Sequence, residues 1–166
     1  MKSHLPTAPL RLLLLVLVTT SAALSACTKD ALEDKRSDEE KITSYLSGNN
    51  ITTAQRQPSG LYYVTVTTAP TNVRATAGKT VSVLYTGYLL DGSVFDASSR
   101  HGNTPFSFTL GTGQVIDGWD EGIALMRKGE KAQLLIPSAL GYGSRSAGSI
   151  PANSVLRFEV ELMDVK

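Results

Sequence analysis

The sequence predicts an α+β domain in which a curved antiparallel sheet of five to six strands wraps around one short helix. From residue 61 onward, most segments are β-branched and aromatic, or they alternate between apolar and polar side chains, which is typical of half-buried strands. In this region residues 115–127 place apolar side chains at helical spacing. One helix among several strands favours a sheet that packs against that helix.

The strands are expected where such runs lie between turn residues. Asp91-Gly92 is the strongest turn, because this dipeptide adopts the tight turn of a hairpin. The last strand has the clearest pattern, since its even positions from Leu156 to Leu162 are apolar and its odd positions are charged. In chain order the expected strands cover residues 61–67, 80–90, 106–110, 131–136 and 156–162. The apolar face of the expected helix is formed by Ile116, Trp119, Ile123 and Met126.

Residues 1–26 are predicted to be a cleaved signal peptide. Lys2 and Arg11 precede a run of seven apolar residues (12–18), and small residues follow, which is the order of a secretory signal. The apolar run is too short to span a bilayer, which needs about 20 residues. Residues 24–27, Leu-Ser-Ala-Cys, resemble the lipoprotein box of bacteria, and the resemblance implies a lipid on Cys27. An ordinary signal peptide with an incidental cysteine is the alternative.

Cys27 is the sole cysteine of the chain, so no internal disulfide can form. Several acyl chains on one terminus would hold a soluble domain at a membrane, whereas a single chain binds only marginally. Thr28 follows the cysteine, and resemblance to lipoprotein sorting in enteric bacteria then implies no retention at the inner membrane. We therefore expect an extracytoplasmic protein anchored to the cell envelope. In a two-membrane bacterium this is the outer membrane, facing the periplasm.

Residues 27–60 are predicted to be a lipidated tether with a short helix. Ser37 and Glu40 have the spacing of a capping box, in which each side chain bonds the other residue's amide. Apolar side chains at 42, 45 and 46 follow, and Gly48 ends a helix of about ten residues. We expect packing or spacing from this helix, without chemistry. Residues 61–166 are the expected folded domain.

Charge and composition exclude several classes of function. Removal of residues 1–26 changes the net charge from +1 to −1, so the chain lacks the basic field that nucleic acid requires. His101 is the one histidine after the signal, and no metal-ligand cluster or Ser-His pair is visible. The glycines at 111 and 113 lack the Lys-Ser/Thr ending of a phosphate loop. No metal and no cofactor are predicted.

Four stretches of the chain, in order and at the right spacing, resemble the FKBP domain. They are VSVLYTGYLLDGSVFDASS (81–99), PFSFTLGTGQVIDGWDEGIALMRKGEKAQLLIP (105–137), SALGYG (138–143) and IPANSVLRFEVEL (150–162). The block GQVIDGWDEG is the most specific, because it sets a glycine-flanked tryptophan at the start of the helix. The resemblance implies an FKBP-like fold and peptidyl-prolyl cis-trans isomerase activity over residues 61–166.

The resemblance also implies the pocket residues. The catalytic set carried over from the family consists of Tyr85, Phe95, Asp96, Ile116, Trp119, Tyr142 and Phe158. Further substrate-binding positions are Phe106, Val115 and Ile150. The Ile116 amide would donate to a bound carbonyl, and the Trp119 indole would form the pocket floor. Such a pocket needs no nucleophile, because rotation about the bond before proline is limited by amide resonance, with a barrier of about 18–20 kcal/mol.

The expected partners are proline-containing polypeptides in the exported fraction, and the family implies macrolides such as rapamycin as ligands. A monomer is expected, because Gly48 and Pro58 interrupt the segment that would form a long dimerising helix. Two other functions remain open. One is a proline-peptide-binding chaperone with little turnover that uses the same groove, and the other is a structural lipoprotein that retains only the fold.

Overall fold

The computed structural model describes residues 36–166. The expected signal peptide (1–26) and the expected lipidation site at Cys27 lie outside the described residues. Within the described part, no helix has the length and apolar character needed to cross a membrane.

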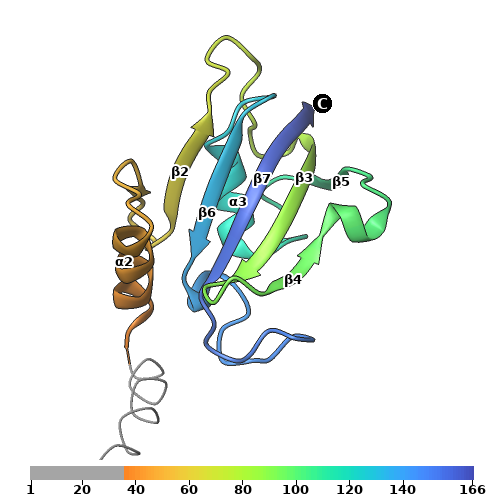
Figure 1. Ribbon diagram of the computed structural model, residues 1–166. Coiled ribbons are helices and arrows are strands. Elements are labelled where there is room, and N and C mark those ends of the chain that lie inside the picture. Colours follow the sequence, from red (N-terminus) through yellow and green to blue (C-terminus); the bar gives the residue numbers. More distant parts are fainter. Residues whose placement is uncertain (1–35) are drawn as a thin grey trace, which may run out of the picture. The chain divides into compact units, whose positions relative to one another are not determined.

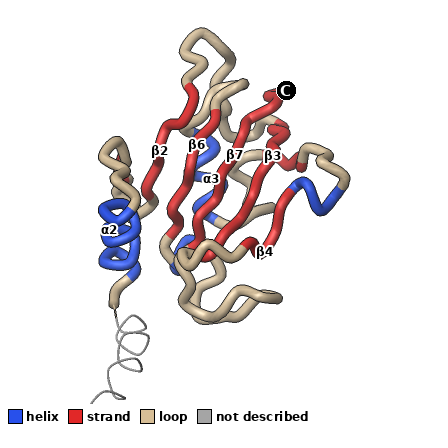
Figure 2. Tube along the Cα trace, viewed as in Figure 1, coloured by secondary structure: helices blue, strands red, loops and turns tan. Residues whose placement is uncertain are grey.

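Seven antiparallel strands form one sheet (Figures 1 and 2). The predicted fold class is confirmed, and the sheet has more strands than the five to six expected. Neighbouring strands follow the order β1-β2-β6-β7-β3-β4. The strand β5 also pairs with β3, next to the part of β3 that pairs with β4. The two strands that the pattern missed are short: β1 has two exposed residues and β4 has four residues. The strands are β1 (Gln55–Arg56), β2 (Tyr62–Thr67), β3 (Thr80–Leu89), β4 (Val94–Ala97), β5 (Phe106–Thr109), β6 (Lys131–Ile136) and β7 (Leu156–Val165).

The helix α3 (Asp117–Ala124) covers one face of the sheet and is shorter than the predicted 115–127 (Figure 1). Ile116 is extended and acts as its N-cap, and Met126 lies beyond its C-terminus. Both residues fit the helical spacing of apolar side chains although neither lies in the helix. Ile116 is apolar because it lines a cavity, and Met126 is apolar because it is fully buried in the core. Two 3₁₀ helices complete the elements, η1 (Ser98–His101) and η2 (Ser138–Leu140).

Two glycines of α3 let it approach the sheet closely. A Cβ atom at Gly118 would lie 2.5 Å from the nearest atom of Ile136, and one at Gly122 would lie 2.7 Å from Leu134. Both distances are well below ordinary van der Waals contact, so a side chain at either position would force the helix away from β6. Trp119 lies between the two glycines and is thereby held against the sheet.

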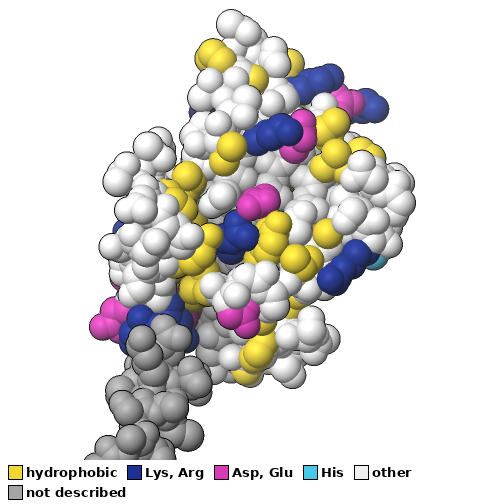
Figure 3. Space-filling model, viewed as in Figure 1, with side chains coloured by type: hydrophobic (Ala, Val, Ile, Leu, Met, Phe, Trp, Pro, Cys, Tyr) yellow, Lys and Arg dark blue, Asp and Glu magenta, His cyan; other side chains and the backbone are white. Residues whose placement is uncertain are grey.

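The helix α2 (Asp38–Gly48) packs against the opposite face of the sheet. Its predicted capping box between Ser37 and Glu40 is present, and its Ile42 and Leu46 are buried. These two residues join a second apolar cluster with Tyr62, Val64, Leu135 and Val155. Hydrophobic side chains are visible between α2 and the sheet in Figure 3. Residues 36–60, expected as part of a tether, thus include a helix and a strand that pack on the domain.

Replacement of Gly118 by alanine is expected to lower the free energy of unfolding by about 1–2 kcal/mol. Overpacking a core costs about 1–3 kcal/mol, and the better helix propensity of alanine returns at most about 1 kcal/mol. Urea unfolding measures this. Gly48→Ala is the matched control, because a Cβ there meets no atom within 4 Å and should leave stability unchanged or higher. Equal stability of Gly118→Ala and the wild type would contradict the close packing of α3.

Candidate active site

A cavity of about 800 Å³ opens between the start of α3, the strands β3, β4, β5 and β7, and the loop after η2. All ten residues that the sequence predicts for the site line this cavity, namely Tyr85, Phe95, Asp96, Phe106, Val115, Ile116, Trp119, Tyr142, Ile150 and Phe158. They come from four strands, one helix and two loops, so the fold brings together side chains that span 74 positions of the sequence.

Trp119 is the centre of the aromatic cluster. Its ring centroid lies 5.0 Å from that of Tyr85 and 5.2 Å from that of Phe158, and both pairs are close to perpendicular. Phe106 adds a third edge-to-face contact at 6.2 Å. Distances of 4.5–7 Å with this geometry are the favourable ones for aromatic pairs. The Trp119 indole nitrogen is buried and has no hydrogen-bond partner among the described residues, so the floor of the cavity offers ring surface.

Phe95 and Phe158 meet edge to face above Gly87 of β3, with ring centroids 5.4 Å apart. A Cβ atom at Gly87 would lie 2.5 Å from the Phe95 ring and 2.8 Å from the Phe158 ring. Gly87 is paired with Phe158 on β7 and with Asp96 on β4. The missing side chain at this position therefore gives both rings the room in which they meet.

Asp96 joins the aromatic cluster to a polar rim. Its Oδ2 accepts a hydrogen bond of 2.6 Å from the Tyr85 hydroxyl, and its Oδ1 lies 3.0 Å from His101 Nε2. Burial and this bond raise the pKa of Tyr85 far above its ordinary value. Burial also raises the pKa of Asp96, but the hydrogen bonds from Tyr85, His101 and the Ala97 amide outweigh it and lower that pKa below 3.8. Asp96 is thus a carboxylate at neutral pH and fixes the Tyr85 ring.

Ile116 and Tyr142 line the cavity, and each carries a hydrogen-bond donor without a partner in the described part of the chain. The amide of Ile116 donates to no protein atom there, while its carbonyl accepts from Trp119 and Asp120 in the first turn of α3. The hydroxyl of Tyr142 likewise makes no hydrogen bond there, and its side chain is 37% exposed. A carbonyl oxygen of a bound peptide would satisfy either donor.

The cavity has a buried, apolar floor and an exposed rim. Trp119, Phe158 and Ile150 are each at most 5% exposed, whereas Phe106 is 45% exposed. A small apolar ring would therefore be enclosed at the floor, while the chain on either side of it would remain at the surface.

Several residues of the site carry no signal in a single sequence. Asp120 accepts hydrogen bonds from the amides of Gly111 and Gly113 at 2.8 and 3.0 Å, and so fixes the loop before α3. His101, to which the sequence pattern assigns no role, contacts Asp96. The loop after η2 places Arg145 at the rim. These contacts depend on loop geometry, which residue spacing does not reveal.

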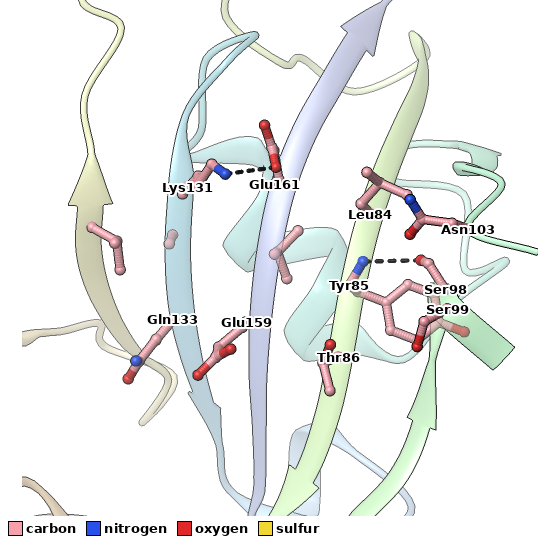
Figure 4. Close-up of a pocket in the computed structure, with 13 residues that line it drawn as sticks. Leu84, Tyr85, Thr86, Ser98, Ser99, Asn103, Lys131, Gln133, Glu159 and Glu161 are labelled. Atoms are coloured by element: carbon pink, nitrogen blue, oxygen red, sulfur yellow. Dashed lines mark hydrogen bonds and ion pairs between the residues drawn. The ribbon is translucent and has the colours of Figure 1, made fainter.

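A second cavity, of about 440 Å³, lies on the other face of the sheet and has a different character (Figure 4). Lys131 and Glu161 form an ion pair of 2.9 Å across it, and Gln133 and Glu159 extend from the neighbouring positions. The Ser98 hydroxyl accepts from the Tyr85 amide there, which fixes the backbone behind the Tyr85 ring. The charged lining of this second cavity does not suit an apolar ring. Within residues 36–166, no three His, Cys, Asp or Glu side chains are grouped to hold a metal ion.

Known proteins match this chain over the same region. The family model for FKBP-type peptidyl-prolyl cis-trans isomerases matches residues 71–163. An FK506-binding protein of Neisseria meningitidis serogroup C is 52% identical over 92 residues, which are 55% of this chain and 84% of that protein. The isomerase FkpA of Aeromonas hydrophila is 41% identical over 138 residues, which are 83% of this chain but 49% of that protein. The chain thus spans about half the length of this relative.

Among solved structures, FkpA from Escherichia coli is similar with a TM-score of 0.69 and 36% sequence identity, over 84% of this chain and 62% of that one. The match of more than half of the chain to one family model agrees with the aromatic cavity. The chain belongs to the family of FKBP-type peptidyl-prolyl cis-trans isomerases and is an enzyme that isomerises the peptide bond before proline.

Proposed function

We propose that the cavity accelerates isomerisation by holding the proline ring on Trp119 and by binding the preceding amide in its twisted form. The observation that carries this proposal is the enclosed set of rings around Trp119, together with the unpaired amide of Ile116 beside it. The ten residues of the cavity would then act as the substrate site, without a nucleophile or a proton transfer.

The physical basis is the change of the amide during rotation. Twisting breaks the resonance of the C–N bond, so the carbonyl becomes less dipolar and loses less when it leaves water. An apolar site therefore binds the twisted form better than either planar form. About 4–7 kcal/mol of such preference would accelerate rotation by roughly three to five orders of magnitude.

The two free donors would hold the substrate while the bond turns. The Ile116 amide would bind a carbonyl of the peptide, and the Tyr142 hydroxyl, on the exposed loop, would bind a second polar atom. Both contacts fix the chain on one side of the rotating bond, so the bound state loses less freedom when it reaches the transition state. The carboxylate of Asp96 would act indirectly, by holding Tyr85 in the cavity wall.

The substrates would be exported proteins, and the enzyme would be a lipid-anchored monomer of the cell envelope. The support for this part is in the sequence: a charged and apolar leader, and a sole cysteine that directly follows Leu-Ser-Ala. Macrolides of the FK506 and rapamycin type are proposed as competing ligands, because several relatives are named for binding FK506 and the floor of this cavity is buried and apolar.

Phe95→Ala is expected to lower kcat/KM for a Leu-Pro peptide by at least about tenfold, because it opens the cavity wall beside Phe158 and admits water. Tyr142→Phe should lower it by less, since it removes one exposed hydrogen bond. A protease-coupled isomerisation assay measures both. Tyr88→Ala is the control, because the Tyr88 ring stacks on Arg157 outside the cavity.

The same assay separates the enzyme from a chaperone with little turnover. If the wild type binds the peptide and prevents aggregation of an unfolded protein but does not speed isomerisation, the catalytic proposal is wrong. If Phe95→Ala isomerises as fast as the wild type, the ring cluster is not the catalytic site.

Cys27→Ser is expected to release the protein from the membrane fraction of cells and to abolish its labelling by radioactive fatty acid, because it removes the acceptor of the lipid. Fractionation of cells that produce the full chain checks this. A wild-type chain that takes up no label, or a variant that is still labelled, would contradict the proposed anchor.

A further inference from the structure

The loop that carries Tyr142 is held by a residue near the start of the described part of the chain. Asp38, the first residue of α2, accepts a hydrogen bond from the Ser138 amide with a length of 2.7 Å between Oδ2 and N. Ser138 begins the 3₁₀ helix η2, and the N-cap of η2 is Pro137, whose side chain makes no capping bond. The carboxylate of Asp38 thus replaces the missing cap from a different element.

Ser138 in turn fixes both sides of Tyr142. Its carbonyl accepts hydrogen bonds from the amides of Gly141 and Gly143, at 2.9 and 2.8 Å. The carbonyl of Gly143 accepts from the Asn153 amide at 2.8 Å, which closes the loop against the start of β7. The residue that receives the bond from Asp38 is therefore the one on which the backbone around Tyr142 rests.

The carboxylate of Asp38 is itself well anchored. The helix that presents it has its capping box in place, and the Ile42 and Leu46 side chains of that helix are buried against the sheet. Lys41 Nζ lies 3.8 Å from Asp38 Oδ1, and the Asp38 side chain is 22% exposed. A charge-assisted bond from a fixed, mostly buried group is among the stronger hydrogen bonds of a protein.

We infer that Asp38 is a positioning residue of the isomerase, which sets the place of the Tyr142 hydroxyl in the cavity through Ser138. This inference rests on the proposed contact between Tyr142 and the substrate. It assigns a role in catalysis to α2, which lies outside the residues 71–163 that the family model matches. The helix would thus be part of the enzyme as well as the start of its folded region.

The test compares two carboxylates in the same turn of α2. Asp38→Ala removes the bond to Ser138. Glu39→Ala removes the same charge one residue later and breaks the contacts of α2 with Arg56 and Tyr62, but it leaves Ser138 untouched. Asp38→Asn keeps an oxygen acceptor at the same place. We expect a fall of about fivefold in kcat/KM for Asp38→Ala, near wild-type values for Glu39→Ala, and recovery of most of the activity in Asp38→Asn.

A second background shows whether Asp38 acts through Tyr142. In Tyr142→Phe, the additional change Asp38→Ala should lower kcat/KM by less than twofold. Hydrogen exchange gives an independent readout: the amides of Gly141 and Gly143 should exchange faster in Asp38→Ala and at the wild-type rate in Glu39→Ala. All rates are measured at a temperature where urea unfolding shows each variant to be folded.

Three results would overturn the inference: wild-type activity of Asp38→Ala, an equal loss in Glu39→Ala, or an undiminished effect of Asp38→Ala in the Tyr142→Phe background. An inactive wild type is a different result, because it removes the proposed function itself and the inference with it. Wild-type activity with no effect of Asp38→Ala removes the inference alone.

Discussion

The edge-to-face contact between Trp119 and Phe158, with ring centroids 5.2 Å apart, joins the helix to the sheet at the bottom of the cavity. It requires α3 to lie very close to the sheet, which the glycines on either side of Trp119 permit. It also requires the Phe158 ring to lie over β3, where Gly87 leaves room for it and for Phe95. Enclosure of an apolar ring, and hence a preference for a less polar amide, follows from these close approaches.

The two faces of the sheet have different roles. On the inner face, apolar side chains of every second residue pack on α3 and end in the aromatic cavity. On the outer face, charged side chains such as Lys131 and Glu161 are partly exposed, and α2 packs over β2 and β6. Through Asp38, α2 also reaches the loop at the cavity rim. The rim is therefore tied to both faces, while the floor depends on the inner core alone.

The sequence predicts most of the fold because its long strands alternate strictly, as β7 does. It misses β1 and β4, which have only two and four residues, and it extends α3 over Ile116 and Met126, whose apolar side chains face the cavity and the core. Resemblance to a family supplied the ten residues of the cavity; alternation and spacing alone did not single them out. The bond between Asp38 and Ser138 joins residues 100 positions apart and could not be found from local pattern.

The most direct test of this account leaves every aromatic ring in place and disturbs only their convergence. In Gly87→Ala the new methyl group would meet Phe95 and Phe158 at 2.5 and 2.8 Å, so the two rings must separate. Exchange NMR of a Leu-Pro peptide, with a trace of enzyme, measures the rate of interconversion of the cis and trans forms. We predict that this rate falls by at least about tenfold in a variant that is still folded. An unchanged rate would show that isomerisation does not depend on the enclosed arrangement of the rings.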